Sequence, residues 1–197
     1  MPTPKRLQRL ITRLDKLEAH LLPTAFSLTG RYTLRQHDYT KAFLLLVHAE
    51  LESYFEDRAR KLVTKAEARY RRSGICTPVL SRILVFHNAA KDELGPVSPK
   101  AVNKAIKYYL DHIDKNHGIK EKNLLTIFLP LGISHAELDA RLVAACNQLS
   151  QKRGQFAHAS LKTHQQVDPK TERDNIKRNI LPELRNLERR FRNLDLP

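Results

Sequence analysis

The residues best suited to chemistry lie in residues 148–160, which read QLSQKRGQFAHAS. In this segment Arg153 and His158 are separated by four residues, the pattern R-x4-H. A planar guanidinium can hold two non-bridging oxygens of a phosphate. A histidine can give or take a proton near neutral pH, because its unperturbed pKa lies close to that range. An arginine and a histidine are therefore the residue types that metal-independent cleavage of RNA requires.

The spacing of this pair sets a geometric condition. On an unbroken α-helix, at about 100° per residue, positions 153 and 158 are separated by about 140° around the axis. Gly154 is a residue type that commonly follows the end of a helix. We therefore predict a helix that ends near Arg153, with a break at Gly154 that turns both side chains toward one pocket. The alternative is an arginine favoured by the helix dipole beside an ordinary surface histidine. In a chain with 35 Lys+Arg and 9 His, the bare pattern favours this alternative.

The elements that position this segment are helices. Apolar residues recur at helical spacing and no convincing strand pattern is found, so the predicted fold class is all-α. Helices are predicted at about residues 4–22, 38–72, 79–89, 99–117, 121–130, from 134 toward 153, and from 169 onward. Ser134 and Glu137 form a capping box for the helix that runs toward Arg153, and Asp168 caps the last helix. No repeat or linker is found, and one domain over residues 1–197 is expected.

Three segments between about residue 40 and residue 160 carry a family resemblance. They are AFLLLVHAELESYFEDRAR (42–60), LLTIFLPLGISHAELDARL (124–142) and LSQKRGQFAHAS (149–160). In this order they resemble the acidic second helix, the lead-in segment and the R-x(4–6)-H signature of the HEPN superfamily (higher eukaryotes and prokaryotes nucleotide-binding domains). The resemblance is closest to the RiboL-PSP-HEPN branch. Many members carry Asn, Asp or His directly after the arginine, whereas this chain has Gly154.

This resemblance implies a HEPN-like up-and-down helical bundle with extra helices. It also implies a homodimer whose two signatures face each other across a shared cleft. The implied activity is a metal-independent endoribonuclease that needs no cofactor and leaves a 2′,3′-cyclic phosphate, with Arg153 as the phosphate clamp and His158 as the general acid or base. Members of this branch are often linked with toxin–antitoxin or antiphage systems. A conditional RNA-cleaving toxin with an antitoxin or regulatory partner is therefore the concrete hypothesis.

Two other functions remain open at this point. The first is a non-catalytic HEPN module that binds RNA, which Gly154 directly after Arg153 favours. The second is a helical interaction protein whose last amphipathic helix docks a partner through Leu184, Leu187 and Phe191. Burial of this apolar stripe within the protomer would argue against the second alternative.

The acidic helix offers carboxylates that could support the Arg–His pair. They are Glu50, Glu52 and Glu56. The resemblance favours Glu52 as a supporting catalytic residue, because the LES segment centres there, and solvated helix charges are the alternative. His48 lies among leucines and is interpreted as a hydrogen-bonded core histidine rather than a catalyst.

The chain carries a formal net charge of +14. Such an excess favours a polyanionic partner, with nucleic acid first and an anionic membrane second. Cations recur at steps of three or four on the second predicted helix, where they would track phosphates and make affinity depend steeply on salt. A solvated face is the alternative. The predicted RNA-binding residues are Arg58, Lys61, Lys65, Arg69, Arg72 and Lys152.

Several classes of site lack support in the sequence. Cys76 and Cys146 are isolated from each other, so neither a disulfide scaffold nor a cysteine-based zinc site is expected, and a reducing cytoplasm fits best. No signal peptide pattern is visible and the apolar stretches are too short to span a bilayer, so a soluble protein is expected. The chain contains no GxxxxGK[ST] phosphate loop, no GxGxxG and no HExxH motif, which removes support for the chemistries that these motifs carry.

Overall fold

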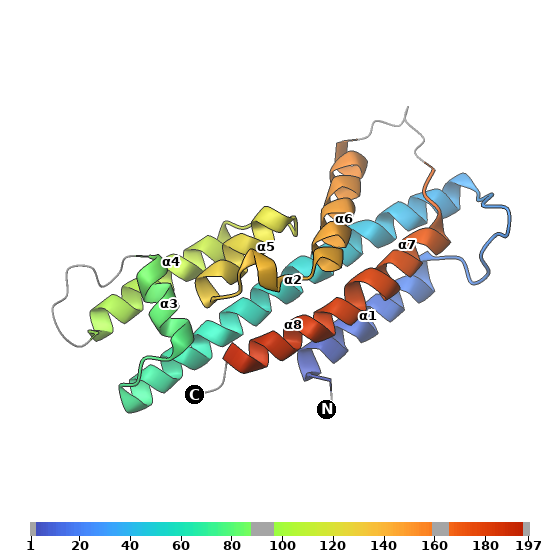
Figure 1. Cartoon of the computed structure of the whole chain (residues 1–197). Coiled ribbons are helices and arrows are strands. Elements are labelled where there is room, and N and C mark those ends of the chain that lie inside the picture. Colours follow the sequence, from blue (N-terminus) through green and yellow to red (C-terminus); the bar gives the residue numbers. More distant parts are fainter. Residues whose placement is uncertain (1–2, 88–96, 159–165, 195–197) are drawn as a thin grey trace. The chain divides into compact units, whose positions relative to one another are not determined.

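The computed structural model describes residues 3–87, 97–158 and 166–194, without the side chains of residues 157 and 158 (Figure 1). Within these ranges all regular structure is helical and no strand occurs, which confirms the all-α fold class. The elements are α1 (Lys5–Leu21), α2 (Leu34–Ser73), α3 (Pro78–Phe86), α4 (Pro99–Asp114), α5 (Glu121–Phe128), the short turns η1 (Leu129–Leu131) and η2 (His135–Glu137), α6 (Ala140–His158), α7 (Pro169–Asn175), the π-helical segment η3 (Ile176–Ile180) and α8 (Leu181–Leu194).

The chain packs as two compact units. The first unit comprises Met1–Tyr54, Gly118–Glu121 and Asp139–Asn186, and the second unit comprises Phe55–His117, Lys122–Leu138 and Leu187–Pro197. Boundaries between the units fall inside α2, after the first residue of α5, and inside α8. The first unit therefore holds Lys152 and Arg153. The second unit holds the predicted basic stripe of α2, which consists of Arg58, Lys61, Lys65, Arg69 and Arg72. One domain over residues 1–197 stays a prediction.

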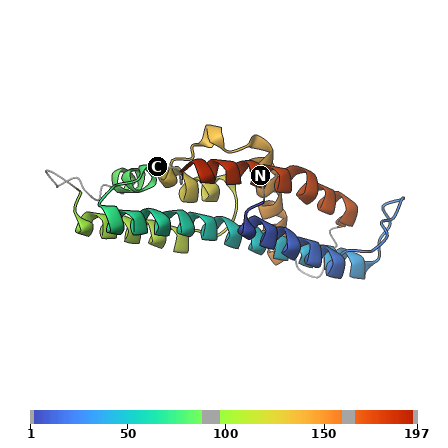
Figure 2. The same cartoon turned by 90° about the horizontal axis from the view of Figure 1, so that it is seen from below.

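The core of the first unit comes from the apolar stripes that the sequence predicts. Helix α1 runs alongside the first half of α2 (Figure 2), with Arg13 Nε donating to Glu50 Oε1 at 2.8 Å. Helix α6 crosses the same half of α2 (Figure 1). Removal of apolar side chains from water is the main term that holds such helices together. The buried apolar residues of these three helices include Leu7, Leu10, Leu14, Leu17, Phe43, Leu44, Val47, Leu51, Leu142, Cys146 and Leu149.

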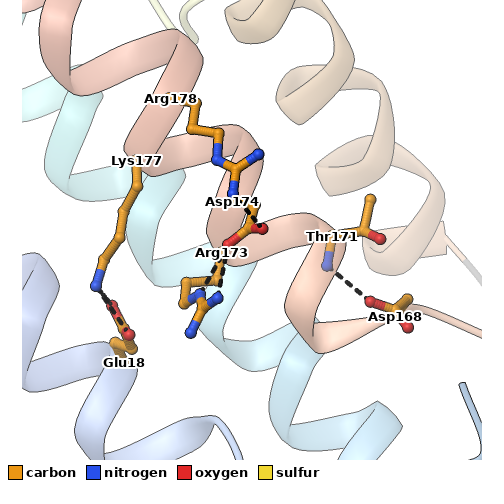
Figure 3. A network of polar contacts seen from close by, with 7 residues as sticks. All are labelled: Glu18, Asp168, Thr171, Arg173, Asp174, Lys177 and Arg178. Atoms are coloured by element: carbon orange, nitrogen blue, oxygen red, sulfur yellow. Dashed lines mark hydrogen bonds and ion pairs between the residues drawn. The ribbon is translucent and has the colours of Figure 1, made fainter. Parts of the chain in front are cut away.

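Polar contacts fix the C-terminal part of the first unit to α1 (Figure 3). Asp168 caps α7 as predicted, because its carboxylate accepts a hydrogen bond from the Thr171 amide at 2.7 Å. Farther along, Lys177 forms an ion pair with Glu18 of α1 at 2.7 Å. The guanidinium of Arg173 lies 4.3 Å from the ring centroid of Phe26, in the connection between α1 and α2. The elements α7 and η3 are thus held against α1 and the segment that follows it.

The beginning of α6 differs from the prediction. Ser134 and Glu137 form the expected capping box, but it opens the single turn η2 and not the long helix. Leu138 then adopts an extended conformation. Helix α6 begins only at Ala140 and is capped by Asp139, whose carboxylate accepts from the amide of Arg141 at 2.8 Å. The local signal was correct for a cap and wrong for the helix it serves.

The end of α6 also differs from the prediction. The helix continues through Gly154 to His158, and Gly154 is absent from the glycines of positive φ among the described residues. The predicted break at Gly154 is therefore wrong. A glycine inside a helix costs about 1 kcal/mol relative to alanine, and the neighbouring glutamines, lysine and arginine are good helix formers that outweigh this cost.

The second unit is built around aromatic residues. The rings of Phe55 and Phe128 meet edge to face at 5.8 Å, and Phe128 lies 5.3 Å from Phe191 of α8. Tyr109 is fully buried and donates its hydroxyl hydrogen to the Ile127 carbonyl at 2.6 Å.

The apolar stripe of the last helix consists of Leu184, Leu187 and Phe191. All three side chains are buried. Since the whole stripe is buried within the protomer, the last helix does not offer it to a partner, and that alternative is wrong.

None of the described helices combines the length and the apolar character that crossing a bilayer demands.

Candidate functional site

Arg153 lies on the exposed side of α6, one turn after a buried polar contact with α2. Ser150 is 7% exposed, and its Oγ lies 3.3 Å from Nε2 of His48, which is 2% exposed. Positions 150 and 153 are three residues apart, so they share one side of the helix. The His48–Ser150 contact therefore fixes the turn of α6 that carries Arg153 against the first half of α2.

Glu52 continues this contact on the other side of the imidazole. Its Oε2 lies 3.7 Å from Nδ1 of His48, one helical turn earlier on α2. Its Oε1 accepts a hydrogen bond from the amide of Gly118, a residue whose φ of 115° favours glycine. The structure thus brings Glu52, His48 and Ser150 into one chain of polar contacts that leads to Arg153. We call these four residues the His48 cluster.

The charges of this cluster act on the histidine. Burial is the largest influence and lowers the pKa of His48 below its usual 6.5, Glu52 opposes this shift, and Arg153 lowers the pKa further. His48 is therefore neutral at neutral pH. A neutral imidazole with a carboxylate near Nδ1 favours the tautomer that carries its hydrogen on Nδ1. In that tautomer Nε2 accepts a hydrogen bond from the Ser150 hydroxyl.

His158, the second residue of the signature, is the last residue of α6. Because the helix is unbroken, positions 153 and 158 lie about 140° apart around its axis. The side chain of His158 lies outside the described part of the structure. The backbone does not bring the two positions to one side of the helix, contrary to the geometry that a break at Gly154 would have given.

Lys152 points to a different partner from Arg153. It forms an ion pair with Glu172 of α7, a carboxylate that is 5% exposed. A buried carboxylate requires such a partner, since an uncompensated charge away from water is costly. Lys152 therefore joins α6 to α7, and its contact with RNA stays a prediction.

The predicted basic stripe is interrupted at its first member. Arg58 is 7% exposed and lies in the second unit against α8. Its Nη2 donates to Oε2 of Glu188 at 2.9 Å, its Nε lies 2.7 Å from Oε1 of the same carboxylate, and its guanidinium is 5.0 Å from the Phe191 ring. The inclusion of Arg58 among surface residues that contact RNA is not supported by this position. Its charge is used inside the protein.

The other members of the stripe are more accessible. Lys61, Lys65 and Arg72 are exposed and Arg69 is partly exposed. A cavity of about 310 Å³ opens at the end of α2 in the second unit. Its lining residues are Leu62, Lys65, Ala66, Ala68, Arg69, Arg72, Thr77, Val79 and Leu194. Contact of these residues with RNA stays a prediction.

Sequence reasoning placed His48 in the core and did not connect it with the signature. The structure agrees that it is buried and hydrogen-bonded. Its connection to Arg153 depends on Ser150, which is 102 residues away in the sequence. The available signals were the spacing of four between His48 and Glu52 and of three between Ser150 and Arg153. Among the described residues, no group of three or more His, Cys, Asp or Glu is arranged to hold a metal ion.

Comparison with known proteins gives one result that bears on the site. No curated protein and no solved structure shows significant similarity to the chain. A protein-family model described as RiboL-PSP-HEPN matches residues 8–187. The match covers nearly the whole chain and includes every member of the His48 cluster. The chain belongs to the RiboL-PSP-HEPN family.

Proposed function

We propose that this protein is a metal-independent endoribonuclease in which Arg153 and His158 act on the scissile phosphate of RNA. Membership of the RiboL-PSP-HEPN family supports a nuclease or RNA-related role in general. The observation that carries the specific proposal is the exposed Arg153 beside the buried polar contacts of Glu52, His48 and Ser150. Polar residues that are held in place from within and adjoin an exposed cation are typical of a functional site.

The proposed reaction is a transesterification within the RNA. The 2′-oxygen attacks the adjacent phosphorus and loses its proton, the bond from phosphorus to the 5′-oxygen breaks, and the leaving oxygen takes up a proton. The products are a 2′,3′-cyclic phosphate and a 5′-hydroxyl. Arg153 holds the non-bridging oxygens, on which negative charge builds, and His158 moves a proton. Glu52 and His48 do not touch RNA in this scheme, and they position the turn of α6 that carries Arg153.

The unbroken α6 bears on how the two residues meet. Dimerisation is typical of the HEPN family, and the shared cleft of such a dimer faces one signature with the other. We propose that Arg153 of one protomer works with His158 of the partner subunit. A separation of about 140° around one helix is then no obstacle, since each residue completes the site on the other chain.

The test is an RNA-cleavage assay in excess EDTA with the natural protein, Arg153→Ala, His158→Ala and Glu52→Gln. We expect cleavage by the natural protein with cyclic phosphate ends. Loss of a group that stabilises transition-state charge commonly costs about 10²- to 10³-fold, and we expect such a loss for Arg153→Ala. Cleavage that survives both alanine substitutions would contradict the assignment of the site.

One observation favours a second candidate, a non-catalytic module that binds RNA. Gly154 stands where many family members have a polar residue, and it lies inside an unbroken helix. Absence of cleavage of every tested RNA by the natural protein, together with salt-dependent RNA binding, would favour this module.

We propose a biological setting on the same basis. A conditional toxin restrained by an antitoxin or regulatory protein is the form of activity to test first, and the isolated cysteines Cys76 and Cys146 favour action in a reducing cytoplasm. Growth arrest on expression of the natural chain, absent with Arg153→Ala, is the expected result. Normal growth with intact RNA on expression of the natural chain would contradict it.

A further inference from the structure

A cluster of aromatic side chains lies in the second unit. Phe86 is the last residue of α3 and is 47% exposed, and Tyr108 on the neighbouring α4 is 42% exposed. His87 lies between them, with its ring centroid 5.2 Å from that of Phe86 and 6.2 Å from that of Tyr108. Helices α3 and α4 are neighbours in the fold (Figure 1). Two exposed rings joined by a third make one apolar surface on these helices.

Lysines lie along α4 beside this surface. The Lys104 ammonium lies 5.9 Å from the Tyr108 ring centroid. Lys100, Lys104 and Lys107 are exposed and recur at steps of four and three along α4, on the side that carries Tyr108. His112, one turn after Tyr108, has its ring centroid 5.0 Å from that of His87. The apolar surface is thus bordered by a row of positive charge.

The imidazole at the centre of the cluster has an unused polar atom. Nε2 of His87 is buried and has no hydrogen-bond partner among the described residues. This atom is closed to a ligand that lies on the exposed rings, so the choice of ligand rests on the rings and the lysines. Exposed rings alone would fit many apolar partners, whereas rings together with lysines fit a ligand that is both aromatic and anionic.

We propose that Phe86, His87 and Tyr108 form a stacking platform for unpaired bases of RNA, with Lys100, Lys104 and Lys107 contacting the adjoining backbone. Aromatic side chains stack on bases of any sequence and the lysines supply attraction to phosphate. Bases inside a duplex already stack on each other and are not available to the platform. The platform therefore selects single-stranded RNA. The proposal adds a substrate class to the RNA-directed function above, and its test is independent of cleavage.

The test measures binding of a fluorescent 2′-O-methyl oligouridine, which cannot be cleaved because its 2′-oxygen carries no proton. Stacking on one aromatic residue commonly contributes about 5- to 150-fold in affinity. Phe86→Ala and Tyr108→Ala are each expected to weaken binding within that range, and Tyr108→Phe is expected to retain it. The natural protein is expected to bind a duplex of the same length more weakly than the single strand.

A matched control is available in the first unit. Tyr39 is 41% exposed and has the guanidinium of Arg35 5.1 Å from its ring centroid, so it resembles Tyr108 in exposure and in its neighbouring cation. Tyr39→Ala is expected to leave oligouridine affinity unchanged. The platform would be overturned if the double variant with Phe86→Ala and Tyr108→Ala bound oligouridine as tightly as the natural protein does. Tighter binding of the duplex than of the single strand by the natural protein would also overturn it. Neither result would bear on the cleavage assignment, which is tested with cleavable RNA.

Discussion

His48 and Arg58 both lie on α2 and both are buried, yet their surroundings differ. In the first unit His48 contacts Ser150 and Glu52, and the exposed guanidinium of Arg153 acts on its pKa. In the second unit Arg58 is enclosed by Glu188 and Phe191. The polar contacts of His48 lead to the surface, whereas those of Arg58 end inside the protein. In this protein, the buried polar contact that we connect with the proposed site is the one that continues to an exposed cation.

Of the effects that distinguish the two regions, the largest is expected from substitution of Arg58, which should lower the free energy of unfolding. Arg58→Ala leaves the carboxylate of Glu188, which is 1% exposed, without this partner, and such changes commonly cost about 3–5 kcal/mol. Urea unfolding measures the loss. The exposed Lys61→Ala is the control and should change stability by less than about 0.5 kcal/mol. Equal stability of the two variants would show that the Arg58–Glu188 pair is not the structural contact described above.

A smaller effect is expected from the protonation of His48. Its pKa is lowered in the folded protein, so the unfolded chain binds more protons between the folded value and 6.5. The stability that neutral His48 contributes is therefore fully present above pH 6.5, and it falls as the pH is lowered through that value. Unfolding by urea at several pH values measures the fall.

The pKa of His87 is also lowered, mainly by burial and then by His112. His87 therefore also contributes to the dependence of stability on pH. His48→Gln is expected to keep only the part that His87 supplies. An unchanged pH dependence in His48→Gln would contradict the account of His48 as a histidine held neutral by burial.

The smallest effect is expected at Gly154. A Cβ at this position meets nothing within 4 Å, and the helix is unbroken, so Gly154→Ala should stabilise the protein by about 0.5–1 kcal/mol. Gly132 is the matched contrast, because its φ is 95° and a Cβ there would clash with the side chain of Arg82. Thermal unfolding should show opposite signs for Gly154→Ala and Gly132→Ala. Destabilisation by Gly154→Ala would instead support a break in α6.

Local signals in the sequence predicted the helices well where one segment decides the outcome. The apolar stripe of α1 and the Asp168 cap of α7 are examples. The capping box at Ser134 misled because η2 separates it from α6, and Gly154 misled because its neighbours continue the helix.

The periodicity of the sequence does not predict contacts between distant segments. The spacing of cations on α2 predicted a stripe that includes Arg58, but the residue that buries Arg58 is Glu188, 130 residues away. The His48–Ser150 contact likewise requires α2 and α6 to cross. The family resemblance identified Glu52, but the reason for its position beside His48 and Gly118 appears only in the folded chain.

The most direct test of the central claim combines two inactive proteins. Arg153→Ala and His158→Ala chains are co-expressed, allowed to form mixed dimers, and assayed for RNA cleavage in EDTA. If each site joins Arg153 of one protomer to His158 of the partner subunit, a mixed dimer keeps one intact site of two, and random pairing restores about a quarter of natural activity. If the mixture showed no activity under conditions in which the natural protein cleaves RNA, that result would contradict a site shared between subunits.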